Sequence, residues 1–230
     1  MFGKERLQHI SSYAGKLLRQ KFGRGPDQIF AYAGDRFLIL YIQHFLSPME
    51  EVLLRQGHED TVDVARTKIV STLLEELRGV IQVTLERDVV HCYHDWNYSS
   101  NHGMMAAVFH QEIAPPLEAP AMVEGAGQGA LELEVARISS LVQKVPERIE
   151  TYRLHPDVYV IIRTGILITL EKALIKKGFE AELLVTKDEL EKTYFRRDGS
   201  LQELFGREMK DIFVDWLLKE DQSLMCIVLK

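Results

Sequence analysis

The sequence has few of the features that would place the protein outside the cell or on nucleic acid. It contains only two cysteines, Cys92 and Cys226, so a disulfide framework is excluded and we expect a reducing, cytoplasmic compartment. Lysine and arginine (28) are outnumbered by aspartate and glutamate (34), and the net charge is −6. With no polybasic cluster, this balance argues against binding to nucleic acid or to an anionic membrane surface.

Long hydrophobic runs are missing too. The longest, residues 37–46, has about ten residues, whereas a membrane-spanning helix needs about 20. Residues 1–19 carry charges throughout, which is not the pattern of a signal peptide. We therefore expect no direct insertion into a membrane. Hydrophobic residues make up 46% of the 230, enough for one large domain or two small ones with a true core.

The first half of the chain has the pattern of one α+β module. Apolar residues at steps of three and four predict helices, and short apolar runs between turn residues predict strands. Gly23 is placed to end the first helix, and Ser47, Pro48 and Glu50 form an N-terminal helix signature with a capping box. The expected elements are a helix over 5–21, strands over 28–33 and 36–45, helices over 48–56 and 59–86, and strands over 89–98 and 103–110.

A second, diverged copy of this module follows at a spacing of about 120 residues. The predicted boundaries are 1–112 for the first module, 113–130 for a linker rich in proline and glycine, and 131–230 for the second module. Asp198-Gly199 is expected to break the long helix of the second copy. The recurring landmarks are Pro26 and Pro146, Glu50 and Glu171, Gly57 and Gly178, and Asp95-Trp96 and Asp215-Trp216.

The repeat predicts the fold class. We expect an α+β protein built as a tandem repeat of a helix-strand-strand-helix-helix-strand-strand module. Each antiparallel sheet should carry its helices packed on one face, because that arrangement buries the apolar strands. Two such modules suggest a pseudo-two-fold relation, like a homodimer fused into one chain.

The loop Gly23-Arg24-Gly25-Pro26 is the most distinctive local feature, and it has two interpretations. In the functional one, flexible backbone amides and an arginine hold a small anion or a partner. In the structural one, the loop only stops a helix before a strand and Arg24 is solvated. The second copy lacks both glycines and the arginine, so any such role belongs to the first copy.

Arg66, on the predicted long helix, could pair with a helix carboxylate or reach a ligand between sheet and helix. Lys187 stands at the matching place in the second copy, and a structural salt bridge is the favoured interpretation. Glu50 and Glu171 are explained by helix capping without catalysis. The recurring Asp-Trp pairs are interpreted as core features, with an inter-repeat contact as the alternative.

Histidines and a cysteine around the last hairpin of the first copy raise the possibility of a zinc site. Strand alternation, however, puts His91 and Asp95 on one face and Cys92 and His94 on the other, so these side chains cannot easily share one ion. No nucleophile elbow, catalytic triad or dinucleotide fingerprint occurs. We expect no catalytic residue, no metal and no cofactor.

The run Phe22-Gly23-Arg24-Gly25-Pro26, an apolar strand, the run Leu46-Ser47-Pro48-Met49-Glu50-Glu51 and an arginine-bearing helix together resemble the MpsC-like family. The family is named for the cytosolic third component of a sodium-translocating, membrane-potential-generating system. The resemblance covers the first copy, over residues 5–110, whereas the second copy resembles the family only weakly. Members of the family are usually single modules, so the tandem form is a departure.

The resemblance implies a bacterial, non-enzymatic accessory or regulatory protein that works through a protein partner. The implied partner is a membrane complex for cation or inorganic-carbon transport. A second interpretation is a ligand-binding module that senses a small anion at Gly23 to Pro26. A third is a metal-dependent enzyme using His91 or His94 with Asp95. The oligomeric state is left open.

Overall fold

The computed structural model describes residues 3–115, 129–198 and 200–230. The chain divides into two compact units, Met1–Pro115 and Pro116–Lys230. Each unit has the predicted order of helices and strands around a four-stranded antiparallel sheet, so the α+β class and the repeated module are confirmed. Most of the predicted linker, 113–130, lies outside the described residues. The pseudo-two-fold relation of the modules remains a prediction.

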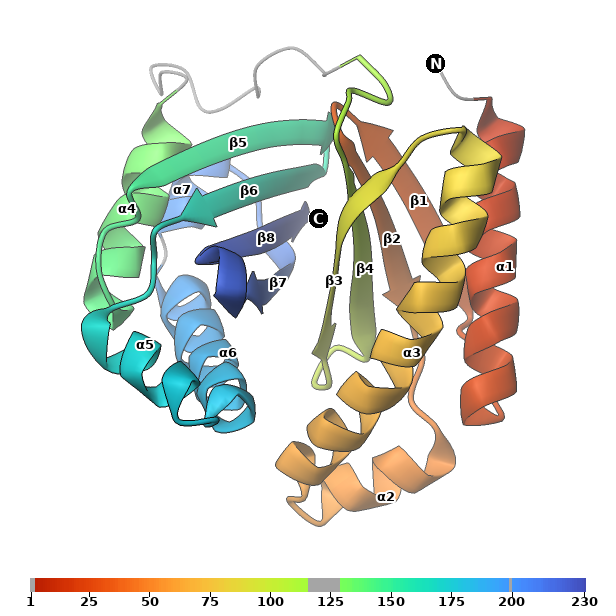
Figure 1. Cartoon of the computed structure of the whole chain (residues 1–230), viewed down its shortest axis with the longest axis horizontal. Coiled ribbons are helices and arrows are strands. Elements are labelled where there is room, and N and C mark those ends of the chain that lie inside the picture. The colour runs from red at the N-terminus through yellow and green to blue at the C-terminus, as the bar shows by residue number, and fades with distance from the viewer. Residues whose placement is uncertain (1–2, 116–128, 199) are drawn as a thin grey trace. The chain divides into compact units, whose positions relative to one another are not determined.

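The sheet of the first unit has the strand order β1-β2-β4-β3, with every neighbouring pair antiparallel (Figure 1). Its two hairpins therefore lie side by side, with β2 and β4 in the middle and β1 and β3 at the edges. The elements are α1 (Lys4–Phe22), β1 (Gln28–Gly34), β2 (Phe37–Gln43), α2 (Pro48–Arg55), α3 (Glu59–Leu85), β3 (Val89–Asn97) and β4 (His102–Phe109).

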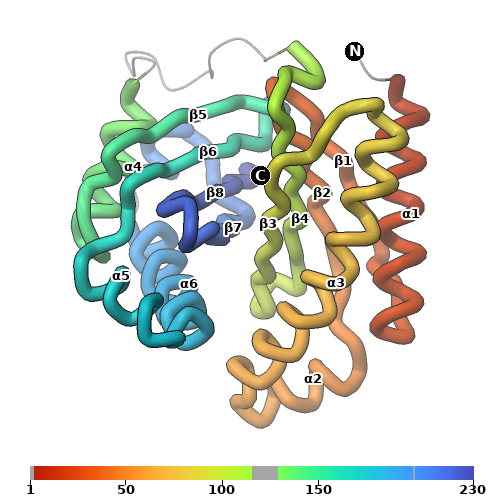
Figure 2. Tube along the Cα trace, viewed as in Figure 1, coloured from red at the N-terminus to blue at the C-terminus, as the bar shows by residue number. Residues whose placement is uncertain are grey.

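The sheet of the second unit repeats this order as β5-β6-β8-β7, and the trace in Figure 2 follows the same path of two hairpins joined by helices. The predicted break in its long helix is confirmed, because α6 ends at Arg197 and a further helix begins at Ser200. The elements are α4 (Ala130–Val142), β5 (Arg148–His155), β6 (Val158–Thr164), α5 (Thr169–Lys176), α6 (Glu180–Arg197), α7 (Ser200–Phe205), β7 (Met209–Leu217), the 3-10 turn η1 (Leu218–Glu220) and β8 (Gln222–Leu229).

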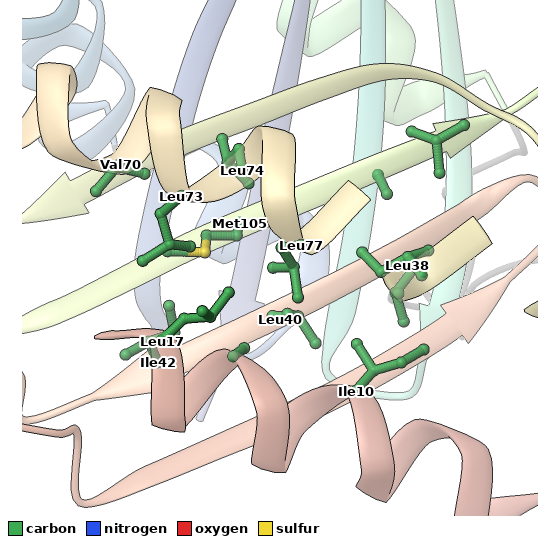
Figure 3. Close-up of a cluster of buried hydrophobic side chains, with 14 of the residues drawn as sticks. Ile10, Leu17, Leu38, Leu40, Ile42, Val70, Leu73, Leu74, Leu77 and Met105 are labelled. Atoms are coloured by element: carbon green, nitrogen blue, oxygen red, sulfur yellow. The ribbon is translucent and has the colours of Figure 1, made fainter. Parts of the chain in front are cut away.

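The core of the first unit lies between the sheet and the helices α1 and α3, which pack beside each other on one sheet face (Figure 3). Alternate residues of β2 point toward these helices, as a side-chain period of two requires. Burial of large aliphatic side chains contributes about 1.5–3 kcal/mol each. Side chains of this core include Ile10, Leu17, Leu38, Leu40, Ile42, Leu73, Leu77 and Met105, all almost fully buried.

Local backbone chemistry sets the ends of the elements. Gly23 ends α1 in the left-handed conformation, with φ of 74°, as the sequence predicts. The second strand was expected to run to Phe45, but β2 stops at Gln43. The reason is His44, whose φ of 53° cannot continue a strand. The element boundary therefore differs while its identity is confirmed.

The recurring tryptophans confirm the repeat in three dimensions. Trp96 lies in β3 opposite Gly103 of β4, and Trp216 lies in β7 opposite Ser223 of β8. Both rings are buried in the core of their own unit, which confirms the core interpretation. Within the described residues, no helix combines the length and apolar character that crossing a bilayer requires.

Candidate functional site

The turn that leads from β2 into α2 is fixed by the capping box that the sequence predicts. The backbone N–H of Ser47 donates to Glu50 Oε2 at 2.8 Å, and the N–H of Glu50 donates to Ser47 Oγ at 3.3 Å. Pro48 occupies the first turn of the helix, where its missing N–H costs no hydrogen bond. The start of α2 is therefore a rigid corner. We call residues 45–51 the α2 corner.

Arg66 of α3 holds the same glutamate from inside. Its Nε donates to Glu50 Oε1 at 3.0 Å, and its Nη2 donates to Glu50 Oε2 at 2.6 Å and to the carbonyl of Phe45 at 3.0 Å. The side chain of Arg66 is completely buried and that of Glu50 is 8% exposed. One carboxylate thus caps α2 and pairs with α3, so the predicted salt bridge of Arg66 is confirmed as a buried, forked pair.

Aromatic rings surround the Arg66 guanidinium. Its central carbon lies 4.4 Å from the centroid of Trp96 and 5.0 Å from that of Phe45. Phe22, from the end of α1, and Tyr98, from beyond β3, complete the shell at 5.1 and 5.9 Å. A planar, weakly hydrated guanidinium suits such a site, because it can stack on aromatic faces while it donates in its own plane.

Arg24 reaches the α2 corner from the predicted loop. Its Nη1 donates to the carbonyl of Leu46 at 3.3 Å and lies 3.7 Å from Glu51 Oε1. The Arg24 side chain is still 41% exposed. Gly25 keeps this loop compact, since a Cβ there would stand 3.0 Å from Arg19 Nε. The structure therefore brings Arg24, from the Gly23 to Pro26 loop, and Arg66 to the same α2 corner.

The exposed surface of α2 carries two apolar side chains. Met49 is 71% exposed and Val52 is 48% exposed, one helical turn apart. Glu51 and Arg55, also on this helix, form an ion pair at 3.6 Å. The corner therefore presents a small apolar patch with charged neighbours. The first turn of the helix that carries this patch is held by the capping box and by the Glu50–Arg66 pair.

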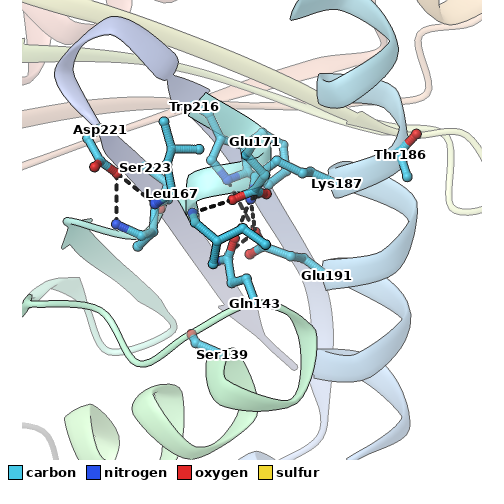
Figure 4. Close-up of polar contacts among 12 residues, drawn as sticks. Ser139, Gln143, Leu167, Glu171, Thr186, Lys187, Glu191, Trp216, Asp221 and Ser223 are labelled. Atoms are coloured by element: carbon cyan, nitrogen blue, oxygen red, sulfur yellow. Dashed lines mark hydrogen bonds and ion pairs between the residues drawn. The ribbon is translucent and has the colours of Figure 1, made fainter. Parts of the chain in front are cut away.

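The second unit preserves the pair at the same place, with lysine instead of arginine. Lys187 Nζ donates to Glu171 Oε1 at 2.7 Å, and the N–H of Ile168 donates to Glu171 Oε2 at 2.8 Å (Figure 4). Gln143 accepts a further hydrogen bond from Lys187. The glutamate again caps one helix and pairs with the next. The Lys187 ammonium lies 5.7 Å from the ring centroid of Trp216. Trp216 corresponds to Trp96, one of the aromatic rings that form a cage around Arg66 in the first unit.

A second buried ion pair joins this network only in the second unit. Arg163 Nη2 donates to Glu191 Oε2 at 2.5 Å, and neither side chain is exposed to solvent. Arg163 also donates to the hydroxyls of Ser223 and Ser139 at 2.9 and 3.2 Å. Glu191 Oε1 accepts from the indole N–H of Trp216 at 3.2 Å. The positive charges of Arg163 and Lys187 are balanced by the negative charges of Glu191 and Glu171.

The first unit has apolar residues where the second unit has this extra pair. Ile42 stands in the position of Arg163 in the strand register, and Gly103 stands in that of Ser223. By the repeat spacing, Val70 of α3 corresponds to Glu191. A Cβ on Gly103 would lie 1.9 Å from the Trp96 ring, so the ring fits there only because residue 103 has no side chain. The exchanges therefore occur together, as two alternative ways of filling one interior.

The histidines near β3 are the candidates for a metal site. In the described residues, no group of three or more His, Cys, Asp or Glu side chains could hold a metal ion. Burial lowers the pKa of His94, which favours its neutral form, and burial raises the pKa of Cys92 to about 11, which leaves it a thiol at neutral pH. Neither group is poised as a nucleophile or an acid near pH 7.

Sequence reasoning missed the Arg163–Glu191 pair and the exposed patch on α2. The signal for the pair was weak, because Arg163 is the next-to-last residue of an otherwise apolar strand, although Ile42 takes its place in the first copy. The exposure of Met49 was harder to predict, because an apolar residue in an amphipathic helix is normally expected to face the core.

Comparison with known proteins finds a family model that matches the first unit. No curated protein and no solved structure matches the chain significantly. Residues 4–111 match the family model described as "Na+-translocating membrane potential-generating system (MpsC)". This range runs from the first residue of α1 past the end of β4 and includes the Gly23 to Pro26 loop, the α2 corner and Arg66. The first unit of this chain is therefore similar to the MpsC family over nearly its whole length.

Proposed function

We propose that this protein is a non-enzymatic accessory subunit that acts by contact with a membrane cation-transport complex, from the cytoplasmic side. The family's description, a sodium-translocating system that generates membrane potential, supports the kind of partner. The observation that carries the proposal is the α2 corner. Both sequence runs on which the family likeness rests meet there, through Arg24 on the outside and the Glu50–Arg66 pair on the inside.

The geometry favours a contact surface over a site for a small anion. The guanidinium of Arg24 lies 3.7 Å from the Glu51 carboxylate, which it shares with Arg55, so part of its charge is balanced. Beside it, Met49 and Val52 offer an apolar patch on a fixed helix, which is the composition of a contact surface. Gly23 to Pro26 and α2 are therefore assigned to one partner-binding surface, with Arg66 as the residue that holds it in shape.

The test is co-purification of the tagged chain from detergent-solubilised membranes of its own cells. We expect the wild type to recover a cation-translocating membrane subunit, and Arg24→Ala to lose it. Arg24 makes one exposed ion pair and one long hydrogen bond, so its loss should lower the free energy of unfolding by no more than about 1 kcal/mol. Arg55→Ala is the matched control, because Arg55 pairs with the same Glu51 from an exposed position.

Two outcomes would contradict the proposal. Recovery of no membrane subunit by the wild type would remove the partner, and full recovery by Arg24→Ala would remove the loop from the contact. Calorimetric titration with bicarbonate tests the anion-sensing alternative. Stoichiometric binding that is lost in Arg24→Ala would favour that alternative over a protein contact.

A further inference from the structure

The four edge strands of the two sheets differ in how well they are protected against pairing with another chain. An exposed edge carries unpaired backbone N–H and C=O groups, and natural proteins blunt it with charges, prolines or bulges. Register shifts of the bulge type interrupt β3, β5 and β7. By contrast, β1 pairs with β2 through seven consecutive residues without a shift.

Strand β1 also lacks charged residues. Its sequence, QIFAYAG, contains neither a charge nor a proline, whereas its counterpart β5 carries Arg148, Glu150 and Arg153. Phe30 stands at the position of Glu150 and is 41% exposed, which is unusual for so large an aromatic side chain. Among the described strands, none pairs with the outer edge of β1. This edge is therefore regular, uncharged and apolar.

We propose that the outer edge of β1 pairs with β1 of a second copy of this chain, joining two first-unit sheets into one continuous antiparallel sheet. The unmet groups of an edge are backbone donors and acceptors, and these select an extended strand as the occupant. Of the edge strands in the described chain, only β1 itself is regular and uncharged. A two-fold axis between two identical copies places the same strand of each copy side by side in antiparallel orientation. The β1 strand of a second copy therefore meets these requirements.

The strand sequence fits a register centred on Ala31. With Ala31 opposite Ala31 of the second copy, Phe30 lies opposite Tyr32 of the second copy. By symmetry, Tyr32 lies opposite Phe30 of the second copy, so the aromatic pair occurs twice. Cross-strand aromatic pairs stabilise antiparallel sheets, and such pairs would cover the exposed part of Phe30. On the other face, Ile29 lies opposite Ala33, and both already pack against the core of their own unit. Between Gln28 and Gly34, no like charges oppose each other in this register.

The second copy supplies the variant that tests this pairing. Gln28→Arg together with Phe30→Glu gives β1 the residues of β5, where Arg148 and Glu150 form an ion pair at 2.9 Å. Both positions are exposed, so the variant should fold with an unchanged circular dichroism spectrum. In the dimer, however, the two new glutamates would lie diagonally across the dyad on one face and repel each other. Val83→Glu, at a position 80% exposed on α3, is the control.

The measurement is the molar mass by sedimentation equilibrium over a series of protein concentrations. We expect the wild type and Val83→Glu to form dimers and the Gln28→Arg/Phe30→Glu variant to be monomeric. Hydrogen exchange should show β1 amides in the wild type that become protected as the concentration rises. A wild type that is monomeric at every concentration, or a β1 variant that still dimerises, would overturn the proposal. The surface is separate from the α2 corner, so failure here leaves the proposed function standing.

Discussion

Replacing Arg66 by methionine should destabilise the first unit by about 3–5 kcal/mol, because the substitution leaves the Glu50 carboxylate buried without its counter-charge. Arg66 makes three hydrogen bonds within 3.0 Å and is the centre of the aromatic cage. Methionine retains much of the volume, so the loss measures the pair and not a cavity. Urea denaturation checks this, with the transition of the first unit followed through the fluorescence of Trp96.

A second substitution distinguishes the lost charge from lost packing. Adding Glu50→Gln to Arg66→Met removes the stranded charge, and the glutamine can still accept the hydrogen bond that caps α2. We expect the double variant to recover most of the loss. Arg66→Lys should cost about 1–3 kcal/mol, since the fork to Glu50 and Phe45 is broken and no counterpart of Gln143 is present. A cost below about 1 kcal/mol for Arg66→Met would contradict the assigned role.

The second large effect is expected at the ion pair that only the second unit has. Arg163→Ile and Glu191→Val, which copy Ile42 and Val70 of the first unit, should each destabilise the second unit by about 3–5 kcal/mol. Arg163→Ile leaves the buried Glu191 carboxylate with Lys187, 3.6 Å away, as its remaining counter-charge, and Glu191→Val removes the carboxylate that pairs with the buried Arg163. Combined in one chain, they should cost about 2–3 kcal/mol less than the sum, because Lys187 and Glu171 still neutralise each other.

A double-mutant cycle measures this difference. We expect a coupling energy of about 2–3 kcal/mol between Arg163 and Glu191, near the upper end for contacting residues. The indole of Trp216 loses its acceptor in both Glu191 variants, and this cost cancels in the cycle. Additive effects of the two substitutions would show that the interior is not organised around this pair.

The sequence predicted the local structure well where short-range chemistry determines it. Ser47, Pro48 and Glu50 act within one helical turn, and Gly23 needs only its own left-handed backbone conformation. The break near Asp198 follows from the same kind of signal. These features depend on neighbours in the chain, so their physical cause is visible in the order of residues.

The buried networks could not be predicted in the same way. Arg163 and Glu191 are 28 residues apart, and they meet only because the tertiary structure brings the end of β6 and helix α6 close together. A charged residue near the end of a strand is normally solvated, which hid Arg163 in the pattern. For Arg66 the sequence offered a carboxylate partner or a ligand, and packing decided in favour of Glu50. That the Gly23 to Pro26 loop meets the α2 corner likewise depends on tertiary structure.

The most direct test of the proposed contact surface compares the same position in the two units. Met49 on α2 and Leu170 on α5 correspond in the repeat and are similarly exposed, at 71% and 65%. Met49→Glu and Leu170→Glu should therefore have equally small effects on folding. In co-purification from solubilised membranes, we expect Met49→Glu to lose the membrane subunit and Leu170→Glu to retain it. Retention of the subunit by Met49→Glu, or equal loss in both variants, would contradict a contact made by the first unit through α2.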